Sequence, residues 1–372
     1  MYDTRVYWLW LHHAFGAGSN KPLSIFRRFN SLQEFYEGGR KLWSQFDFIS
    51  EKNLFTLESY TLEKAQAQLE FCTKLDQEVY CYECFDYPEK LKNIDTPPSV
   101  FFAKGTLPDF DNVLTITVVG SRKTSKDIIE LTQNFCYELS KNGAIIVSGG
   151  AIGIDSAAHT GSLRATGVNA CVLPCGLDSP YLMENMAMRQ QIVYKGGCMI
   201  SEYPSNTPVY KGAFQVRNRL MSALGNGLLV MRAAKRSGTM ITVAHATNQN
   251  KDIFAVPGNI SDPTAKGTNE LIRDGAVPVL AVRDILDAYP NYQKIKTKTF
   301  DTMSDTIRKD CTILSPNALE VYKFMSINPT HISKLCEFTK LKTSQVQAAI
   351  TELEMLDYID TFAGQRCSLK KN

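Results

Sequence analysis

The sequence predicts an α/β protein with a Rossmann-like, doubly wound and mostly parallel sheet, preceded by a small helical domain and followed by a winged-helix-like domain. Residues 111–288 alternate short apolar strands with helices, and residues 1–75 carry only helical patterns. The end of the chain carries three helical patterns and two short strands. At 372 residues the chain is long enough for two or three domains.

We predict four segments along the chain. Residues 1–75 form an N-terminal helical domain of the SAM or helix-hairpin-helix kind. Residues 76–290 form the Rossmann-like domain, whose lead-in at 76–110 is extended and interrupted by prolines. A polar linker at 291–310 then leads to a winged-helix-like domain at 311–372.

Short apolar runs define the predicted sheet. These runs are 113–119, 144–147, 170–173, 198–200, 228–231, 253–256 and 277–280. Helical segments separate them: one is capped by Ser125 and ends near Asn142-Gly143, and another starts at Asp155. Because the runs are apolar throughout, both faces of the sheet must be covered, which is typical of parallel strands.

Helical spacing dominates the N-terminal segment. The residues that recur at this spacing are Leu23, Phe26, Phe29, Leu32, Phe35 and Tyr36. The run Phe15–Gly18 supplies a tight turn between helices. With Lys21, Arg27 and Arg28 nearby, this turn could contact a phosphate backbone; a helical bundle with a surface turn is the alternative.

The C-terminal segment has the order of a winged helix. Its helical patterns are 318–325, 332–339 and 344–356, and its strands are 357–360 and 367–369, around a turn with Gly364. Such folds often place the third helix in a DNA groove. The charged residues near this helix are Lys340 and Lys342 before it and Glu352, Glu354 and Asp357 along or beyond it. With so few cations, a protein contact or a weak DNA contact fits the sequence at least as well as groove binding.

Composition excludes several classes of protein. At 44% hydrophobic and 21% charged residues the chain resembles an ordinary globular protein. No apolar run approaches the roughly 20 residues of a membrane helix, and the start of the chain lacks the pattern of a signal peptide. Cys81 and Cys84 form one C-x-x-C with no second pair, so we expect no metal, no cofactor, and reduced thiols in a cytoplasmic protein.

Positive charge is concentrated in one stretch, although the net charge is only +3. From Tyr203 to Lys251 there is no Asp or Glu, and the cations are Lys211, Arg217, Arg219, Arg232, Lys235, Arg236 and Lys251. Such a stretch produces a local positive field, which a polyanionic partner requires. A solvated basic face balanced by acids elsewhere is the alternative.

Unusual residues collect where the predicted strands end. They are Gly120-Ser121-Arg122, Ser148-Gly149-Gly150, Pro174-Cys175-Gly176, Ser201-Glu202-Tyr203, Lys235-Arg236-Ser237-Gly238-Thr239 and Pro257-Gly258. A ligand of an open parallel sheet binds beyond the carboxyl ends of the strands. These runs are therefore expected to meet at one edge.

The chemistry at this edge indicates phosphate binding. Glycines let backbone amides approach an anion, and helix N-termini add oriented N–H groups. The hydroxyls of Ser148, Ser237 and Thr239 can donate hydrogen bonds, and the guanidinium groups of Arg122 and Arg217 can fork onto phosphate oxygens.

An aromatic residue among the cations favours single-stranded nucleic acid. Phe214 lies between Lys211 and Arg217, where it could stack on a base that duplex DNA would not expose. Alternatives remain for single residues. Phe214 could belong to the core, Asp155 could be a helix N-cap, and His159 could be a packed histidine.

The motifs at the strand ends resemble those of the DNA-processing protein A (DprA/Smf) family. They are Val119-Gly120-Ser121-Arg122, the run 146–159, Ser201-Glu202-Tyr203-Pro204, the run 214–219, Ser237-Gly238-Thr239, Val256-Pro257-Gly258 and Gly267-Thr268-Asn269. The resemblance spans about residues 87–288 in order. It implies a dimeric cytoplasmic protein that binds single-stranded DNA and loads the RecA recombinase in homologous recombination and natural transformation.

The resemblance also implies roles for residues. By analogy the DNA strand is bound directly by Arg122, Lys211, Phe214 and Arg217. The phosphate pocket is completed by Ser148, Gly149, Gly150, Asn218, Arg219, Ser237, Gly238 and Thr239. Three positions depart from the family pattern: Arg232 stands where Glu is common, Asp127 replaces a glycine, and Leu182 replaces a proline.

A nucleotide phosphoribohydrolase with a related Rossmann variant is the main alternative. Such enzymes carry a catalytic Glu three residues beyond a Gly-Thr pair, whereas here Thr242 follows Gly238-Thr239 at that spacing. Asp155 and Glu202 could substitute only for a rotated substrate. A nicotinamide dehydrogenase is disfavoured because the first loop lacks G-x-G-x-x-G. We therefore predict a binding protein and no catalytic residues.

Overall fold

The computed structural model describes residues 2–165, 167–292, 315–325, 329–339, 341–356, 358–362 and 365–370. The chain forms two compact units, Met1–Thr297 and Lys298–Asn372, and each has its own hydrophobic core. Apart from Asn291 and Tyr292, the predicted linker lies outside the described residues, as do Lys340, Asp357 and the turn at Gly364.

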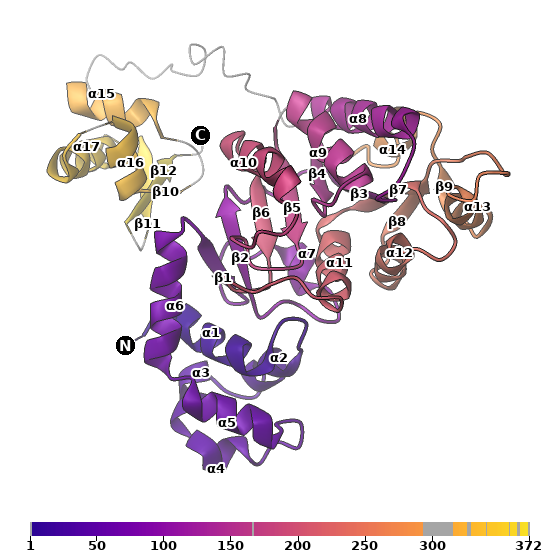
Figure 1. The fold of residues 1–372 in the computed structure, drawn as a ribbon. Coiled ribbons are helices and arrows are strands. Elements are labelled where there is room, and N and C mark those ends of the chain that lie inside the picture. The colour runs from indigo at the N-terminus through magenta and orange to yellow at the C-terminus, as the bar shows by residue number, and fades with distance from the viewer. Residues whose placement is uncertain are drawn as a thin grey trace. The chain divides into compact units, whose positions relative to one another are not determined.

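A sheet forms the centre of the first unit (Figure 1). Its strands are β1 (Glu78–Cys81), β2 (Val100–Gly105), β3 (Thr115–Gly120), β4 (Ile145–Ser148), β5 (Asn169–Leu173), β6 (Cys198–Ser201), β7 (Gly227–Arg232), β8 (Asp252–Ala255) and β9 (Val277–Pro278). Their spatial order is β1-β2-β6-β5-β4-β3-β7-β8-β9. From β6 to β9 all neighbours are parallel, while β2 joins β6, and β1 joins β2, in antiparallel pairs.

The strand order reverses between β3 and β7. From β3 the chain proceeds through β4 and β5 to β6, and it then returns to the other side of β3 with β7, β8 and β9. At such a reversal the connections leave toward opposite faces, which opens a crevice outside the carboxyl ends of the strands. The residues that follow β3 and β7 therefore border this crevice.

Helices cover both faces of the sheet. They are α7 (Glu89–Lys92), α8 (Lys126–Lys141), α9 (Ile154–Ala165), α10 (Met186–Tyr194), α11 (Ala213–Leu224), α12 (Thr239–Asn248), α13 (Lys266–Arg273) and α14 (Val282–Leu286). The pleat of β3 alternates between two cores. Ile116 and Val118 pack with α8 and α9, whereas Val119 packs with α11 and α12. Thr117 faces α11 and donates a 2.6 Å hydrogen bond to the carbonyl of Met221.

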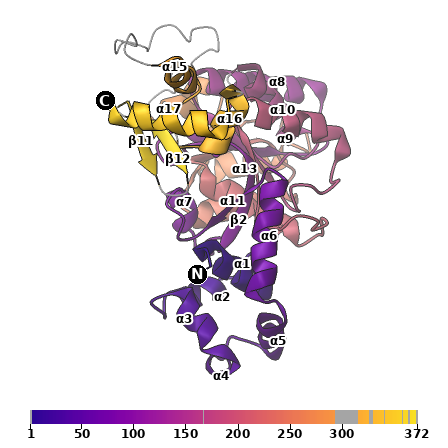
Figure 2. The ribbon, with the colours of Figure 1, turned by 90° about the vertical axis from the view of Figure 1, so that its left-hand side faces the viewer.

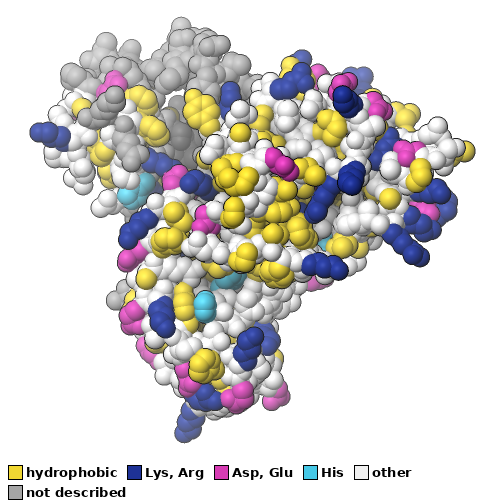
Figure 3. Space-filling model, viewed as in Figure 1, with side chains coloured by type: hydrophobic (Ala, Val, Ile, Leu, Met, Phe, Trp, Pro, Cys, Tyr) yellow, Lys and Arg dark blue, Asp and Glu magenta, His cyan; other side chains and the backbone are white. Residues whose placement is uncertain are grey.

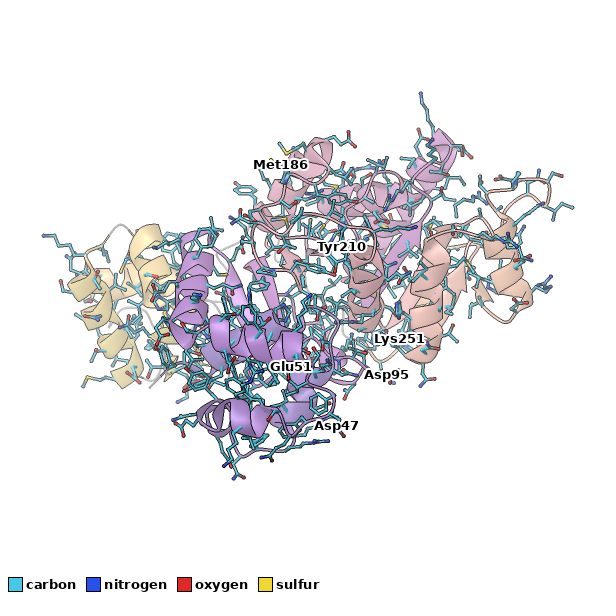
Figure 4. All side chains as sticks on the ribbon, turned by 60° about the horizontal axis from the view of Figure 1, so that its bottom comes forward. Asp47, Glu51, Asp95, Met186, Tyr210 and Lys251 are labelled. Carbon is cyan, nitrogen blue, oxygen red and sulfur yellow. The ribbon has the colours of Figure 1, made fainter. Side chains whose placement is uncertain are left out.

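Six N-terminal helices lie together at one end of the sheet in Figures 1 and 2. They are α1 (Thr4–Phe15), α2 (Lys21–Phe26), α3 (Leu32–Glu37), α4 (Gly39–Trp43), α5 (Glu51–Ser59) and α6 (Leu62–Lys74). Trp8 and Trp10 of α1 are fully buried in a core that includes Val100 and Phe102 of β2. Glu51, labelled in Figure 4, begins α5 and pairs with Arg40 at 2.6 Å.

The second unit has three helices and a small sheet among its described residues. The helices are α15 (Pro316–Lys323), α16 (Ile332–Thr339) and α17 (Thr343–Met355), and the strands are β10 (Thr330–His331), β11 (Ile359–Phe362) and β12 (Arg366–Leu369). Strand β12 pairs antiparallel with both β10 and β11. This is the winged-helix arrangement.

The predicted fold class is confirmed, with additions in the lead-in. Residues 76–110 were expected to be extended, and they contain β1, α7 and β2, which lengthen the sheet at its edge. The prolines hid this regularity, because Pro88, Pro97 and Pro98 lie between the two strands. The segment boundaries at 75/76 and 290/291 stay predictions.

His12 generates a prediction about pH and stability. Its ring lies against Phe102 of β2, with ring centres 6.3 Å apart, and its Nδ1 is 3.1 Å from the hydroxyl of Ser99; burial lowers its pKa to about 4. Between pH 6.5 and about 4 the unfolded chain therefore binds more protons than the folded chain. The contribution of neutral His12 is fully present above pH 6.5 and is lost as the pH falls toward 4.

His12→Gln is expected to unfold with a free energy that falls less steeply than that of the unmodified protein between pH 6.5 and about 4. Urea titrations at several pH values measure this. His331→Gln, which changes an exposed imidazole in the second unit, serves as the control. An equally steep fall in His12→Gln would show that this imidazole is not the titrating group.

Candidate nucleic-acid interface

The loops that follow β3, β4 and β7 contact one another. The amide of Ser121 donates to the carbonyl of Arg232 at 2.9 Å, and the amide of Ile154 donates to the carbonyl of Ser121 at 3.3 Å. Gly153 lies so close that a Cβ there would come within 2.6 Å of the carbonyl oxygens of Ser121 and Arg122. The predicted gathering of these loops at one sheet edge is present in the structure.

Two arginines lie against the ring of Phe214. The guanidinium carbon of Arg122 is 5.0 Å from the ring centre, and that of Arg217 is 6.0 Å away. Tyr181 meets the same ring edge to face, with centres 6.1 Å apart. Phe214 is half-buried and Arg122 is exposed, so one face of the cluster is available for a ligand. Cation–π contacts of this kind fix arginines without neutralising them.

Arg217 is largely internal, with 5% of its surface exposed. Nη1 donates to the carbonyls of Gly149 and Val172, and Nε donates to Asn218 at 3.1 Å. These bonds connect the first turns of α11 to the ends of β4 and β5. Among the described residues Nη2 has no hydrogen-bond partner, so it is the part of the guanidinium left for an anion.

Gly149 allows this packing. A Cβ at that position would lie 2.4 Å from Nη1 of Arg217 and 2.6 Å from Oδ2 of Asp155. Asp155 is buried in the first turn of α9. Burial lowers the pKa of Arg217 and raises the pKa of Asp155, while each charge opposes the shift of the other. Gly150 has φ +63, a left-handed conformation that favours glycine.

Ser148 and His159 belong to the interior. The hydroxyl of Ser148 donates to the carbonyl of Val118 at 2.7 Å, so it already has an acceptor inside the sheet. His159 is fully buried with Nδ1 3.1 Å from Asn169, and burial lowers its pKa to about 4. Its burial agrees with the interpretation of His159 as a packed histidine.

Arg219 points to a different partner from Arg217. It forms a 2.5 Å ion pair with Glu202, which is only 2% exposed and also accepts the amide of Gly18 at 2.8 Å. The turn Phe15–Gly18, considered as a possible phosphate contact, therefore uses this amide to bind a carboxylate of the sheet. Burial raises the pKa of Glu202, and Arg219 is the strongest influence in the opposite direction.

The remaining predicted residues lie at the rim. Lys211 is exposed just before α11, and Tyr210 beside it, labelled in Figure 4, has its hydroxyl 3.2 Å from that of Tyr203. Gly238 is exposed at the start of α12, Thr239 is buried, and the hydroxyl of Ser237 is buried without a described partner. Figure 3 shows Lys and Arg side chains over the ends of β3 and β7 and around α12 and α13.

Sequence reasoning missed Tyr181 and Arg189. The guanidinium carbon of Arg189 is 5.6 Å from the centre of the Tyr181 ring, which in turn meets Phe214. Arg189 is buried on α10, far in the sequence from the end of any strand. Only the position of this helix in the fold brings Arg189 to the Phe214 cluster, so the sequence carries no signal for it. Leu182 next to Tyr181 has φ +48, a left-handed conformation that a proline ring forbids, so the proline expected here from the resemblance could not adopt this backbone.

Neither a metal cluster nor a membrane span is found among the described residues. No three side chains of His, Cys, Asp and Glu lie together as ligands would, and the thiols of Cys81 and Cys84, 3.3 Å apart, have no third ligand. None of the described helices is both long and apolar enough to cross a bilayer.

The fold and the site together define an α/β protein whose cationic, aromatic sheet edge fits a polyanion. A family model for DNA recombination-mediator protein A matches residues 78–290, and a model for the DprA winged helix domain matches residues 312–365. The chain belongs to the DNA recombination-mediator protein A family, which confirms the resemblance to DprA/Smf.

Relatives and solved structures agree. The DNA processing protein DprA of Bacillus subtilis is 34% identical over 214 residues, which cover 58% of this chain and 72% of that protein. DprA of Streptococcus pneumoniae matches with a TM-score of 0.65 at 27% identity, covering 77% of this chain and 98% of that one. DprA of Helicobacter pylori, described with a single-stranded DNA binding mode, matches with a TM-score of 0.51 at 28% identity, covering 57% and 94%.

Gly149→Ala is expected to lower the free energy of unfolding by roughly 1–3 kcal/mol, because the new methyl group overlaps the guanidinium of Arg217 and the carboxylate of Asp155. Gly238→Ala is the matched control, because a Cβ there meets nothing within 4 Å and its φ of −60° suits alanine. Chemical denaturation of both variants measures the difference. Equal stability of the two variants would contradict the close packing at Gly149.

Proposed function

We propose that this protein binds single-stranded DNA along the edge formed by the loops after β3, β4 and β7, and that it promotes RecA loading in recombination and natural transformation. The observation that carries most weight is the contact of Arg122 and Arg217 with one half-buried ring, Phe214. A phosphodiester chain needs cations that still have free donors, and its unpaired bases need an aromatic face. The described binding mode of the Helicobacter pylori relative supports the same partner.

The contributions of the predicted residues differ. Arg122, Lys211 and Phe214 are accessible and would contact the strand directly. Arg217, Ser148 and Gly149 would act mainly by holding the loops in place, since their polar groups already have internal partners or neighbours. Ser237, Gly238 and Thr239 would offer the start of α12 to a phosphate. Gly150, Asn218 and Arg219 would complete the surrounding structure.

An enzymatic role has less support than binding. Glu202, the carboxylate that a phosphoribohydrolase could have used, is 2% exposed and engaged by Arg219 and Gly18. Thr242, at the position of the expected catalytic Glu, is 2% exposed on α12. Asp155 lies behind Gly149, where burial raises its pKa. We infer that neither Asp155 nor Glu202 is placed to serve as a ribosyl-transfer catalyst.

We further infer that the protein acts in the cytoplasm as a homodimer. Strand β9 is an outer strand of the sheet and exposes Val277 at 42%, and Leu280 just beyond it is 79% exposed. The exposed apolar side chains of Val277 and Leu280 are suited to packing against a second copy. The winged-helix unit would contribute a protein contact or a weak DNA contact.

The purified protein is expected to bind oligo(dT) without nucleotide or metal, and to bind a duplex of equal length more weakly. Affinity should fall steeply with salt, because bound cations on the DNA are released. Fluorescence anisotropy at several salt concentrations measures this. The phosphoribohydrolase alternative predicts instead that AMP is cleaved and that Glu202→Gln abolishes turnover, so cleavage of AMP would overturn the binding proposal.

Arg122→Ala is expected to weaken oligo(dT) binding about 10-fold or more and to reduce the slope of log K against log salt by roughly 0.7. Phe214→Leu should weaken it by about 5- to 100-fold, since leucine fills the space but cannot stack on a base. Arg122 is preferable to Arg217 because it is exposed, so its loss leaves the fold intact. Arg283→Ala, an exposed cation on α14, is the control and should bind as before. Full affinity in Arg122→Ala would contradict the assigned interface.

A further inference from the structure

Arg232 ends β7, at the point where the strand order reverses. It is 7% exposed, and its carbonyl accepts the amide of Ser121 from the loop after β3. Its guanidinium packs against Gly258, where a Cβ would lie 1.9 Å from Nη1 and 2.5 Å from the methyl of Ala265. Gly258 is in turn fixed by Asn269, which forms 3.0 Å hydrogen bonds with both its amide and its carbonyl. The guanidinium is therefore confined by backbone.

Within the part of the chain that the structure describes, the side chain of Arg232 has no hydrogen-bond or ion-pair partner. Nε and Nη1 of Arg232 are buried without a hydrogen bond, and the side chain joins no ion pair with any residue that the structure describes. The other buried arginines differ: Arg217 donates to two carbonyls, Arg219 pairs with Glu202, and Arg189 donates to the carbonyl of Leu182. Arg189 and Arg219 also bury nitrogens without a partner, but among the described residues Arg232 is the one buried arginine whose guanidinium makes neither a hydrogen bond nor an ion pair.

Nearby carboxylates do not neutralise it. Asp127, in the first turn of α8, and Asp262 both have a lowered pKa. The positive charge of Arg232 contributes least to the lowering of either pKa. Their own hydrogen bonds, to Ser125 and Thr264, come first. Neither carboxylate forms an ion pair with the guanidinium. An unpaired buried charge is strongly destabilising, so an anion from outside the chain is the expected counter-charge.

The connection between β7 and α12 supplies further donors. The hydroxyl of Ser237 is also buried without a described partner. Helix α12 begins at Thr239 with no side-chain cap. The amides of Met240 and Ile241 donate to the carbonyls of Ser237 and Gly238 at 3.1 and 3.2 Å, so the candidate donors are the hydroxyl of Ser237 and the amide of Thr239. Lys266 and Arg236 are exposed on either side, and Lys235 pairs with Glu270 at 2.9 Å. The surroundings are cationic and rich in donors, which suits a multivalent oxyanion rather than a neutral ligand.

We propose that Arg232, assisted by Ser237 and the start of α12, binds a phosphoryl oxyanion; Ser237 and α12 are shared with the proposed strand interface, whereas Arg232 is not part of the Phe214 cluster. The anion could be inorganic phosphate, a phosphomonoester, or one phosphodiester of a bound strand, because all three present the same charged oxygens. This site does not require that the strand bind along Arg122 and Phe214. It depends on the arginine that this chain carries at the end of β7.

Arg232→Met, which removes the charge and keeps the length, tests the site. Proteins purified in phosphate-free buffer are melted with and without millimolar inorganic phosphate. Phosphate should raise the melting temperature of the unmodified protein and of the control Arg283→Met, which changes an exposed cation on α14, by about 2 °C or more, and it should not change that of Arg232→Met. Without phosphate, Arg232→Met should melt at a higher temperature than the unmodified protein, because an uncompensated charge has been removed.

Three results would overturn the site. The first is that phosphate does not raise the melting temperature of the unmodified protein, and the second is that phosphate raises that of Arg232→Met equally. The third is that Arg232→Met fails to fold, because this would mean that another group of the chain already compensates the charge. Isothermal titration calorimetry with phosphate gives a second measure, in which Ser237→Ala should bind several-fold more weakly. Unchanged phosphate affinity in that variant would remove Ser237 from the site.

Oligo(dT) binding then identifies the source of the phosphoryl group. If a phosphodiester of the strand occupies the site, Arg232→Met weakens oligo(dT) binding and millimolar phosphate competes with the strand on the unmodified protein. If a free phosphate or phosphomonoester occupies it, oligo(dT) affinity is the same in both proteins while the phosphate response is still lost. Arg122→Ala tests strand binding separately, so failure of one proposal does not imply failure of the other.

Discussion

The buried guanidinium of Arg217 determines the geometry of the candidate interface. It bonds the first turns of α11 to the carbonyl of Gly149 at the end of β4 and to that of Val172 in β5. Because Phe214 precedes it by one helical turn, fixing Arg217 also fixes the ring, and Arg122 then packs on that ring from the loop after β3. The arrangement requires a glycine at position 149, since any side chain there would occupy the space of the guanidinium.

Much of this arrangement follows from the sequence, because apolar strands and Gly/Ser loops are local patterns. The parallel strands, the helix that begins after Ser125 and the meeting of the loops at one edge were all predicted, and the structure contains them. The predicted capping by Ser125 is wrong, because its side chain makes no hydrogen bond to the first amides of α8. Which way each arginine points was not predictable. Arg217 and Arg219 are two residues apart on one helix, so they project to different sides, and only the tertiary packing decides which side meets β4 and which meets Glu202.

Long-range pairing explains what the sequence concealed. Ser148 looks like a donor to a ligand when only its own loop is considered, yet its acceptor is the carbonyl of Val118 in the neighbouring strand. Strands β1 and β2 were not predicted because prolines lie between them in the sequence. The pairing of β2 with β6, which is distant in sequence, includes them in the sheet. Tyr181 and Arg189 reach the cluster through a loop and a helix that carry no motif of their own.

The bond between Gly18 and Glu202 has a consequence for how this protein can be divided. The matched family region begins at residue 78, which suggests a module that could be excised. Excision there would remove one of the two donors to a carboxylate that is 2% exposed, and would uncover Phe102 and its neighbours in the shared core. The N-terminal helices thus cover part of the sheet, and the apolar residues of β2 stay buried only while these helices remain attached.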